Sequence, residues 1–82
     1  MRYLAHIDDG ARRLVLTLEN EQNQQLQRVY TFAEIRSRTR EEQIEFLISD
    51  LTWPGTRNAG LSPIAKAWAT AQVVLVRDRF IL

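Results

Sequence analysis

The sequence predicts a small α+β domain in which two α-helices pack on one face of an antiparallel β-sheet. Three observations carry this prediction: alternating apolar residues near the start of the chain, two helix-start signals in its second half, and β-branched residues near its end. They place the elements in the order βββααβ. A length of 82 residues fits a single domain, residues 1–82, with a small core.

The first two strands form a predicted hairpin. Residues 2–7 and residues 13–18 are rich in large apolar side chains, and the Asp-Gly pair at 9–10 indicates a tight turn between them. In the second strand three leucines recur at period two and therefore share one face of the sheet: Leu14, Leu16 and Leu18. We expect this face to form the core.

A third strand is predicted over residues 26–32. Every second residue of this segment shares one face: Leu26, Arg28, Tyr30 and Phe32. A rival interpretation makes residues 19–29 helical, because Glu and Gln are good helix formers. No apolar stripe supports that helix before Leu26, so the strand is favoured.

The first helix is predicted to begin at Thr39. Thr39 and Glu42 have the spacing of a capping box, in which each side chain accepts a hydrogen bond from the backbone N–H of the other residue. Four apolar residues then fall on one helical face: Ile44, Leu47, Ile48 and Leu51. Pro54 and Gly55 are expected to end the helix.

The second helix is predicted to begin after Ser62, which has the chemistry of an N-cap, with Pro63 at the first helical position. Its predicted apolar face includes alanines that allow close approach to the sheet or to the first helix: Ile64, Ala67, Trp68 and Ala71. Residues 73–82 allow two interpretations. Their β-branched residues favour a strand from near Val73, although Val74 and Leu75 also continue the helical pattern.

Composition narrows the classes of function. The chain contains no cysteine, which excludes disulfides, iron–sulfur clusters, thiolate zinc sites and thiol nucleophiles. Its formal net charge of +1 is too close to neutral for a general binder of polyanions. No apolar run is long enough to span a membrane, and the N-terminal residues do not resemble a secretory signal, so we expect a cytoplasmic protein with no membrane partner.

Catalytic chemistry has little support in the sequence. His6 is the only histidine, and Asp8, two residues away, fits turn chemistry better than a catalytic pair. The chain has no glycine-rich phosphate loop, and its adjacent carboxylates at 8–9 and 41–42 fit a turn and a helix N-terminus. We therefore expect no catalytic residue, no metal ligand and no cofactor, in a protein that is not an enzyme.

Three alternating arginines precede the first predicted helix, and we refer to them as the arginine stripe: Arg36, Arg38 and Arg40. If residues 35–39 are extended, the three side chains project the same way, close to a helix N-terminus that also favours oxyanions. The glutamates that follow at 41, 42 and 45 would repel a polyanion. A solvated surface, a complementary protein partner and a nucleic-acid contact are the three interpretations, in that order of preference.

Trp53 lies in the loop predicted between the two helices, and it also allows two interpretations. It can fold back as a plug over the core, which is the common outcome in so small a domain. It can instead anchor an interface together with Arg57 and Asn58 in the same loop, because Trp and Arg often carry binding energy. Trp68, on the inner face of a predicted helix, is expected in the core.

The segment from the first helix to the second resembles a known family. The stretches "TREEQIEFLISDL", "PG" and "GLSPIAKAW" are similar to the helical half of small phage-encoded anti-CRISPR proteins that inhibit type I CRISPR complexes. The similar segment covers about a third of the chain, and its matching positions are Glu42, Gln43, Pro54, Gly55, Gly60, Leu61 and Ile64. The resemblance implies an inhibitor of a bacterial defence complex.

The leading hypothesis is a non-enzymatic protein-interaction domain, bacterial or phage in style, that occupies a surface of a larger bacterial protein or complex. The expected contacts are the arginine stripe with Trp53, Arg57 and Asn58. The alternative is a nucleic-acid-binding accessory protein that uses the arginine stripe. A homodimer joined through exposed strand edges, including residues 73–82, is a third hypothesis.

Overall fold

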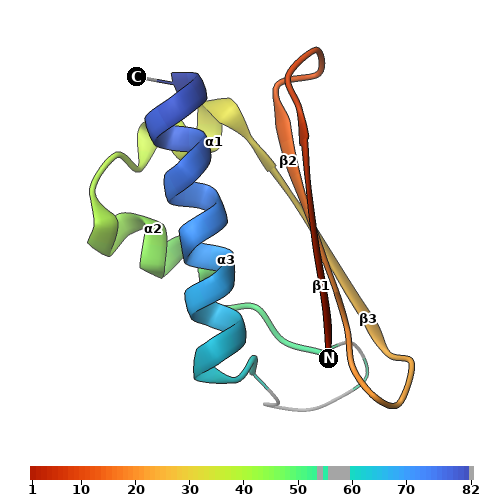
Figure 1. Cartoon of the computed structure of the whole chain (residues 1–82). Helices are drawn as coiled ribbons and strands as arrows, with labels where there is room; N and C mark the ends of the chain where they lie inside the picture. The colour runs from red at the N-terminus through yellow and green to blue at the C-terminus, as the bar shows by residue number, and fades with distance from the viewer. Residues whose placement is uncertain (54, 56–59, 82) are drawn as a thin grey trace.

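The computed structural model describes residues 1–53, 55 and 60–81. Over these ranges a three-stranded sheet is followed by helices that lie along one side of it (Figure 1). The elements are β1 (Arg2–Asp8), β2 (Arg13–Glu19), β3 (Gln25–Thr31), α1 (Phe32–Ser37), α2 (Glu41–Ile48), α3 (Pro63–Val76) and the π-helical turn η1 (Arg77–Ile81). The predicted α+β class is confirmed.

No helix within the described ranges has the length and apolar character needed to cross a membrane.

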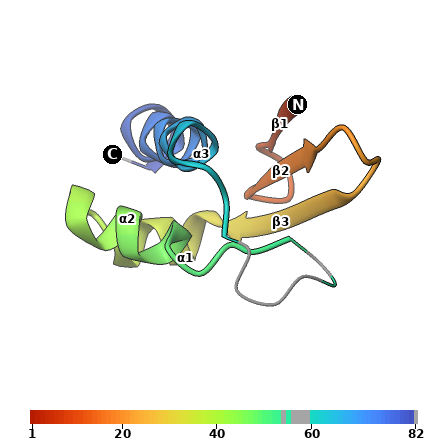
Figure 2. The same ribbon diagram turned by 90° about the horizontal axis from the view of Figure 1, so that it is seen from below.

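The predicted hairpin and the third strand are confirmed. The strands form an antiparallel meander with β2 in the middle, so that Leu16 lies opposite Ala5 on one side and Arg28 on the other. The core side of the sheet carries fully buried leucines from β2, which are joined by two residues of β3: Leu14, Leu16, Leu18, Leu26 and Tyr30. The helices cover this side, as the view along the sheet shows (Figure 2).

Helix α1 replaces the end of the predicted third strand and the segment expected to be extended. A capping box fixes its start, because the Thr31 hydroxyl accepts a hydrogen bond from the Glu34 N–H at 3.1 Å and a Glu34 carboxylate oxygen accepts one from the Thr31 N–H at 3.1 Å. Phe32 and Ile35 then point into the core. The signal was present in the sequence, but the alternation of the preceding strand obscured it.

The capping box predicted between Thr39 and Glu42 at the start of the first predicted helix, which corresponds to α2, is wrong. Helix α2 begins after Arg40, which makes no side-chain capping hydrogen bond. The Thr39 carbonyl instead accepts a hydrogen bond from the Arg77 guanidinium at 3.2 Å, which ties this linker to η1. The helix ends at Ile48, earlier than expected, although Leu51 beyond it is still fully buried.

The predicted start of α3 is confirmed. The Ser62 hydroxyl accepts a hydrogen bond from the Ala65 N–H at 3.2 Å, and Pro63 is the first helical residue.

The predicted apolar face of α3 is wrong. The face that packs on the core consists of Ala65, Ala69, Val73 and Val76. The residues expected there lie elsewhere on the helix: Ile64 is 74% exposed, Ala67 and Ala71 are exposed, and Trp68 is half-buried. The error follows from the expected strand at Val73, because a helix ending before that residue would leave out both valines of the true core face.

The predicted C-terminal strand is also wrong, since α3 runs to Val76 and η1 continues to Ile81. Residues 64–81 contain neither glycine nor proline, so nothing in the local sequence stops the helix. Val73 and Val76 fall on the same side as Ala65 and Ala69 and are fully buried. Burial of this continuous stripe outweighs the β-propensity of the individual residues.

Candidate protein-interaction site

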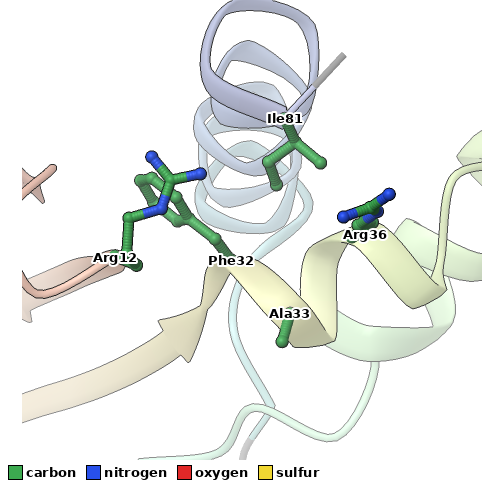
Figure 3. A pocket seen from close by; sticks show the side chains of 5 residues that line it. All are labelled: Arg12, Phe32, Ala33, Arg36 and Ile81. Atoms are coloured by element: carbon green, nitrogen blue, oxygen red, sulfur yellow. The ribbon is translucent and has the colours of Figure 1, made fainter.

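An open hollow of about 300 Å³ lies where the β1–β2 turn, α1 and η1 meet (Figure 3). Five residues line it: Arg12, Phe32, Ala33, Arg36 and Ile81. The guanidinium groups of Arg12 and Arg36 stand toward opposite ends, and the apolar side chains of Phe32 and Ile81 lie between them. A hollow of this kind combines an apolar wall with positive charge on two sides.

Arg12 is held in place by three separate contacts. Its guanidinium pairs with the Asp9 carboxylate at 2.8 Å, donates to the Phe80 carbonyl at 3.4 Å, and lies 4.6 Å from the centre of the Phe32 ring. Its backbone adopts φ 58°, in the left-handed region, which turns the chain from the hairpin loop into β2. Arg12 is therefore a fixed part of the wall whose charge is partly balanced by Asp9.

The apolar wall of the hollow is formed by residues of α1 and η1, the first and the last helical elements of the chain. Phe32 is the first residue of α1 and is buried, and its ring lies 5.8 Å from the Phe80 ring of η1. The contact between α1 and η1 brings Ile81 over the hollow, where Figure 3 shows it between the two arginines. The helical C-terminal segment therefore supplies Ile81 to the wall of the hollow.

Arg36 supplies the more available charge. It lies in the last turn of α1, is exposed, and makes no ion pair with any residue in the described ranges. A carboxylate that entered the hollow could accept hydrogen bonds from Arg36 while its aliphatic part contacted Phe32 and Ile81.

A second arginine of the stripe lies beside an exposed aromatic ring. The Arg38 guanidinium stands 5.9 Å from the centre of the Phe46 ring, and Phe46 on α2 is 69% exposed. These two residues border a smaller hollow of about 190 Å³ with Leu47, Ser49 and Asp50. Arginine and aromatic residues together at a surface are typical of the residues that carry binding energy in protein interfaces.

The arginine stripe is not the extended row that the sequence suggested. Arg36 is helical, Arg38 follows the end of α1, and Arg40 immediately precedes α2. The three share one property, because none forms an ion pair with another residue of the described part of the chain. They stay candidates for contact with an acidic partner.

The predicted loop site is only partly described. Trp53 is 9% exposed and packs with the core, beside the isolated bridge between Thr52 and Gly60. This placement agrees with the interpretation as a plug. Arg57 and Asn58 lie outside the described residues, so the site they were predicted to form with Trp53 stays a prediction.

Neither His6 nor Asp8, the pair considered for catalysis, lines these hollows. His6 is exposed on the outer side of the sheet. Asp8 accepts a hydrogen bond from the Ala11 N–H at 3.0 Å and lies 3.9 Å from the Arg13 guanidinium, which is the turn chemistry expected of it. Within the described ranges no three acidic, histidine or cysteine side chains are grouped so that they could hold a metal ion.

Sequence reasoning missed several residues of the site. Arg12, Phe32 and Ile81 come from three distant segments, and no local pattern indicates that they meet. Phe46 could have been found, because it lies off the apolar face of its helix, so exposure of a large aromatic ring followed from the periodicity.

Comparison of the chain with protein-family models, with curated proteins and with solved structures gives no match.

Proposed function

We propose that this chain is a non-enzymatic protein-interaction domain that binds an acidic segment on the surface of a larger bacterial protein or complex. The observation that carries the proposal is the hollow with Arg12 and Arg36 at its two ends and Phe32 and Ile81 between them. Its chemistry fits an Asp or Glu side chain, or a peptide carboxylate, next to an aliphatic group.

The neighbouring surface supports the same assignment. Arg38 and Phe46 add a second arginine–aromatic pair, and Arg40 adds a charge with no ion-pair partner within the described ranges. A partner that covers this surface would remove water from Phe46, whose ring is mostly exposed. Desolvation of an aromatic ring flanked by arginine contributes to binding through both apolar burial and charge pairing.

The sequence resemblance to anti-CRISPR proteins gives the proposal a specific form. The larger partner would then be a type I CRISPR complex, and the domain would act by occupying one of its protein surfaces. This form is tested by expressing the chain in a bacterium with an active type I system and counting phage plaques. Protection of the phage that is lost with Arg36→Glu would support it, and unchanged immunity would exclude it.

The general proposal is tested with paired peptides. An array of acidic peptides that contain leucine is compared with the same sequences carrying Asn and Gln in place of Asp and Glu. Binding should require the carboxylates, and Arg36→Gln should weaken it about tenfold or more, in the range of a charge-assisted hydrogen bond. Arg13→Gln is the matched control, because it removes the same charge from an exposed position on β2.

Nucleic-acid binding is the outcome that would replace this proposal. A nucleic-acid contact would show as binding to DNA or RNA at low salt. The logarithm of the association constant should then fall against the logarithm of the salt concentration with a slope of about −1 per phosphate contact. Peptide binding that is absent while such nucleic-acid binding is present would overturn the proposal.

A further inference from the structure

Strand β1 is an open edge of the sheet. It pairs with β2 on one side, and no other strand within the described ranges pairs with it. The Phe32 N–H donates to the Arg12 carbonyl. In an antiparallel ladder the backbone N–H and C=O groups of successive residues point alternately to the two neighbouring strands, so those of the even residues of β2 point toward β3 and those of its odd residues point toward β1. The backbone groups of Tyr3, Ala5 and Ile7 then point outward from the edge.

The sequence of β1 is complementary to itself in the antiparallel direction. When two copies are aligned about Ala5, Arg2 of one copy lies opposite Asp8 of the other at both ends of the strand. Tyr3 then lies opposite Ile7, and Leu4 lies opposite His6. Opposite charges and apolar pairs directly across a ladder stabilise strand pairing. We infer that two copies of this chain pair through their β1 edges, antiparallel and centred on Ala5.

The other edge of the sheet is unsuited to the same pairing. An antiparallel pair of β3 strands with full overlap is centred on Arg28, so that two arginines lie directly opposite each other. Like charges in this position are destabilising. Charge therefore selects β1 over β3 as the self-pairing edge.

An exposed stripe on α3 adjoins the β1 edge and gives a second observation. The four residues predicted to face the core share one face of α3, on which Ile64, Ala67 and Ala71 are exposed and Trp68 is half-buried. Contact between the two is direct, because the Trp68 ring stacks on the Tyr3 ring with centroids 5.1 Å apart. Figure 2 shows α3 beside β1, on the side of the sheet that carries the helices.

The two features belong to one interface. In the proposed dimer a two-fold axis perpendicular to the sheet passes between the two Ala5 residues. The two sheets then form one continuous sheet, and both α3 helices lie on the same side of it. The apolar stripe of one α3 is then brought toward the stripe of the other, and the alanines allow close approach of the helix backbones. The α1 and α2 side, with the arginine–aromatic hollows, stays outside this interface.

A single cysteine tests the register, because the natural chain has none. In the proposed dimer Ala5 of one copy lies opposite Ala5 of the other, at a separation that a disulfide can span. Under oxidising conditions Ala5→Cys should therefore form a covalent dimer in high yield, at dilutions where random collision is rare. Gln27→Cys is the matched control, since Gln27 is an exposed residue of the β3 edge.

Sedimentation equilibrium tests the association itself. The chain should have twice its monomer mass at high micromolar concentration, and Ala5→Lys should return it to the monomer by placing two cations at the two-fold axis. Arg2→Glu should raise the dimer dissociation constant about tenfold, because both end pairs become repulsive. Arg40→Glu makes the same charge change away from β1 and should leave it unaltered.

The inference is overturned if the natural chain stays monomeric at millimolar concentration, or if Gln27→Cys cross-links while Ala5→Cys does not. A monomer whose β1 edge instead takes up a strand from a different protein would also overturn it. Circular dichroism and urea unfolding of each variant show that a loss of dimer is not a loss of fold.

Discussion

The Arg12 guanidinium lies 4.6 Å from the centre of the Phe32 ring, and the backbones of the same two residues are joined by a hydrogen bond from the Phe32 N–H to the Arg12 carbonyl at 2.9 Å. Arg12 also donates to the Phe80 carbonyl. One side chain thus connects the hairpin, the start of α1 and the C-terminal turn η1. The hollow proposed for partner binding depends on this connection.

Removal of the Arg12 side chain should weaken the fold. Arg12→Ala loses the contact with the Phe32 ring, the hydrogen bond to Phe80 and the pair with Asp9, so the free energy of unfolding should fall by about 1 to 2 kcal/mol. Urea unfolding measures this change. Arg12→Gly should be less destabilising than Arg12→Ala, because glycine adopts the left-handed backbone of this position without strain. Equal losses for Arg12→Ala and Arg13→Ala would contradict the connecting role.

Two threonines distinguish the observed cap from the expected one. Thr31→Ala removes the capping box of α1 and should cost about 1 kcal/mol of stability. Thr39→Ala should cost much less, because Thr39 contributes its backbone carbonyl, and not its side chain, to the contact with Arg77. Thermal unfolding of both variants gives the comparison. A larger loss at Thr39 would restore the capping box that the sequence suggested.

The sheet could be predicted because its signals are local. The period-two leucines of β2 and the Asp-Gly turn report on neighbouring residues, and the structure confirms both. The start of α3 at Ser62 was equally local. Such signals depend on backbone geometry over a few residues, which a single sequence contains.

The C-terminal helix could not be predicted, because the decision is made by packing. Residues near Val73 have the propensity of a strand but also continue the helical pattern, and burial of Val73 and Val76 on one side of α3 decides for the helix. The same error hid the site, because Ile81 reaches Phe32 and Arg36 only when this segment is helical. Arg36 was named as a candidate contact residue from its charge alone, while its neighbours in the hollow were not named.

Trp53 and Phe46 should respond in opposite ways to truncation. Trp53 is 9% exposed and packs with the core, so Trp53→Ala should lower the free energy of unfolding by about 3 to 5 kcal/mol. Phe46 is 69% exposed, so Phe46→Ala should change stability by less than about 0.5 kcal/mol. Chemical unfolding measures both. In the peptide-binding assay Phe46→Ala should lose affinity. A stable Trp53→Ala protein with weakened binding would instead make Trp53 the interface anchor.

The Tyr30 hydroxyl is a buried polar group with no hydrogen-bond partner among the described residues, and the residue is 4% exposed. Tyr30→Phe keeps the ring and removes this hydroxyl, so it should leave stability unchanged or raise it by about 1 kcal/mol. Urea unfolding at neutral pH gives the comparison. A loss of more than about 1 kcal/mol would show that the hydroxyl has a favourable interaction in the folded protein.

The same residue predicts how stability changes in alkali. Burial raises the pKa of the Tyr30 phenol from 10.0 to about 12, with a smaller opposing effect of Arg28. The unfolded chain therefore releases this proton before the folded chain does. The free energy of unfolding is therefore unaffected by this titration below pH 10. It falls as the pH rises from 10 toward 12, by about 3 kcal/mol in total.

Tyr30→Phe is the control that isolates this titration, because the other ionisable groups are common to both proteins. Between pH 9 and pH 12, unfolding free energies measured by urea denaturation should fall more steeply for the natural chain than for the variant, and the two curves should separate from about pH 10 upward. Parallel curves over this range would mean that the Tyr30 phenol has the same pKa in the folded and in the unfolded chain. That result would contradict the rise in pKa that burial is expected to cause.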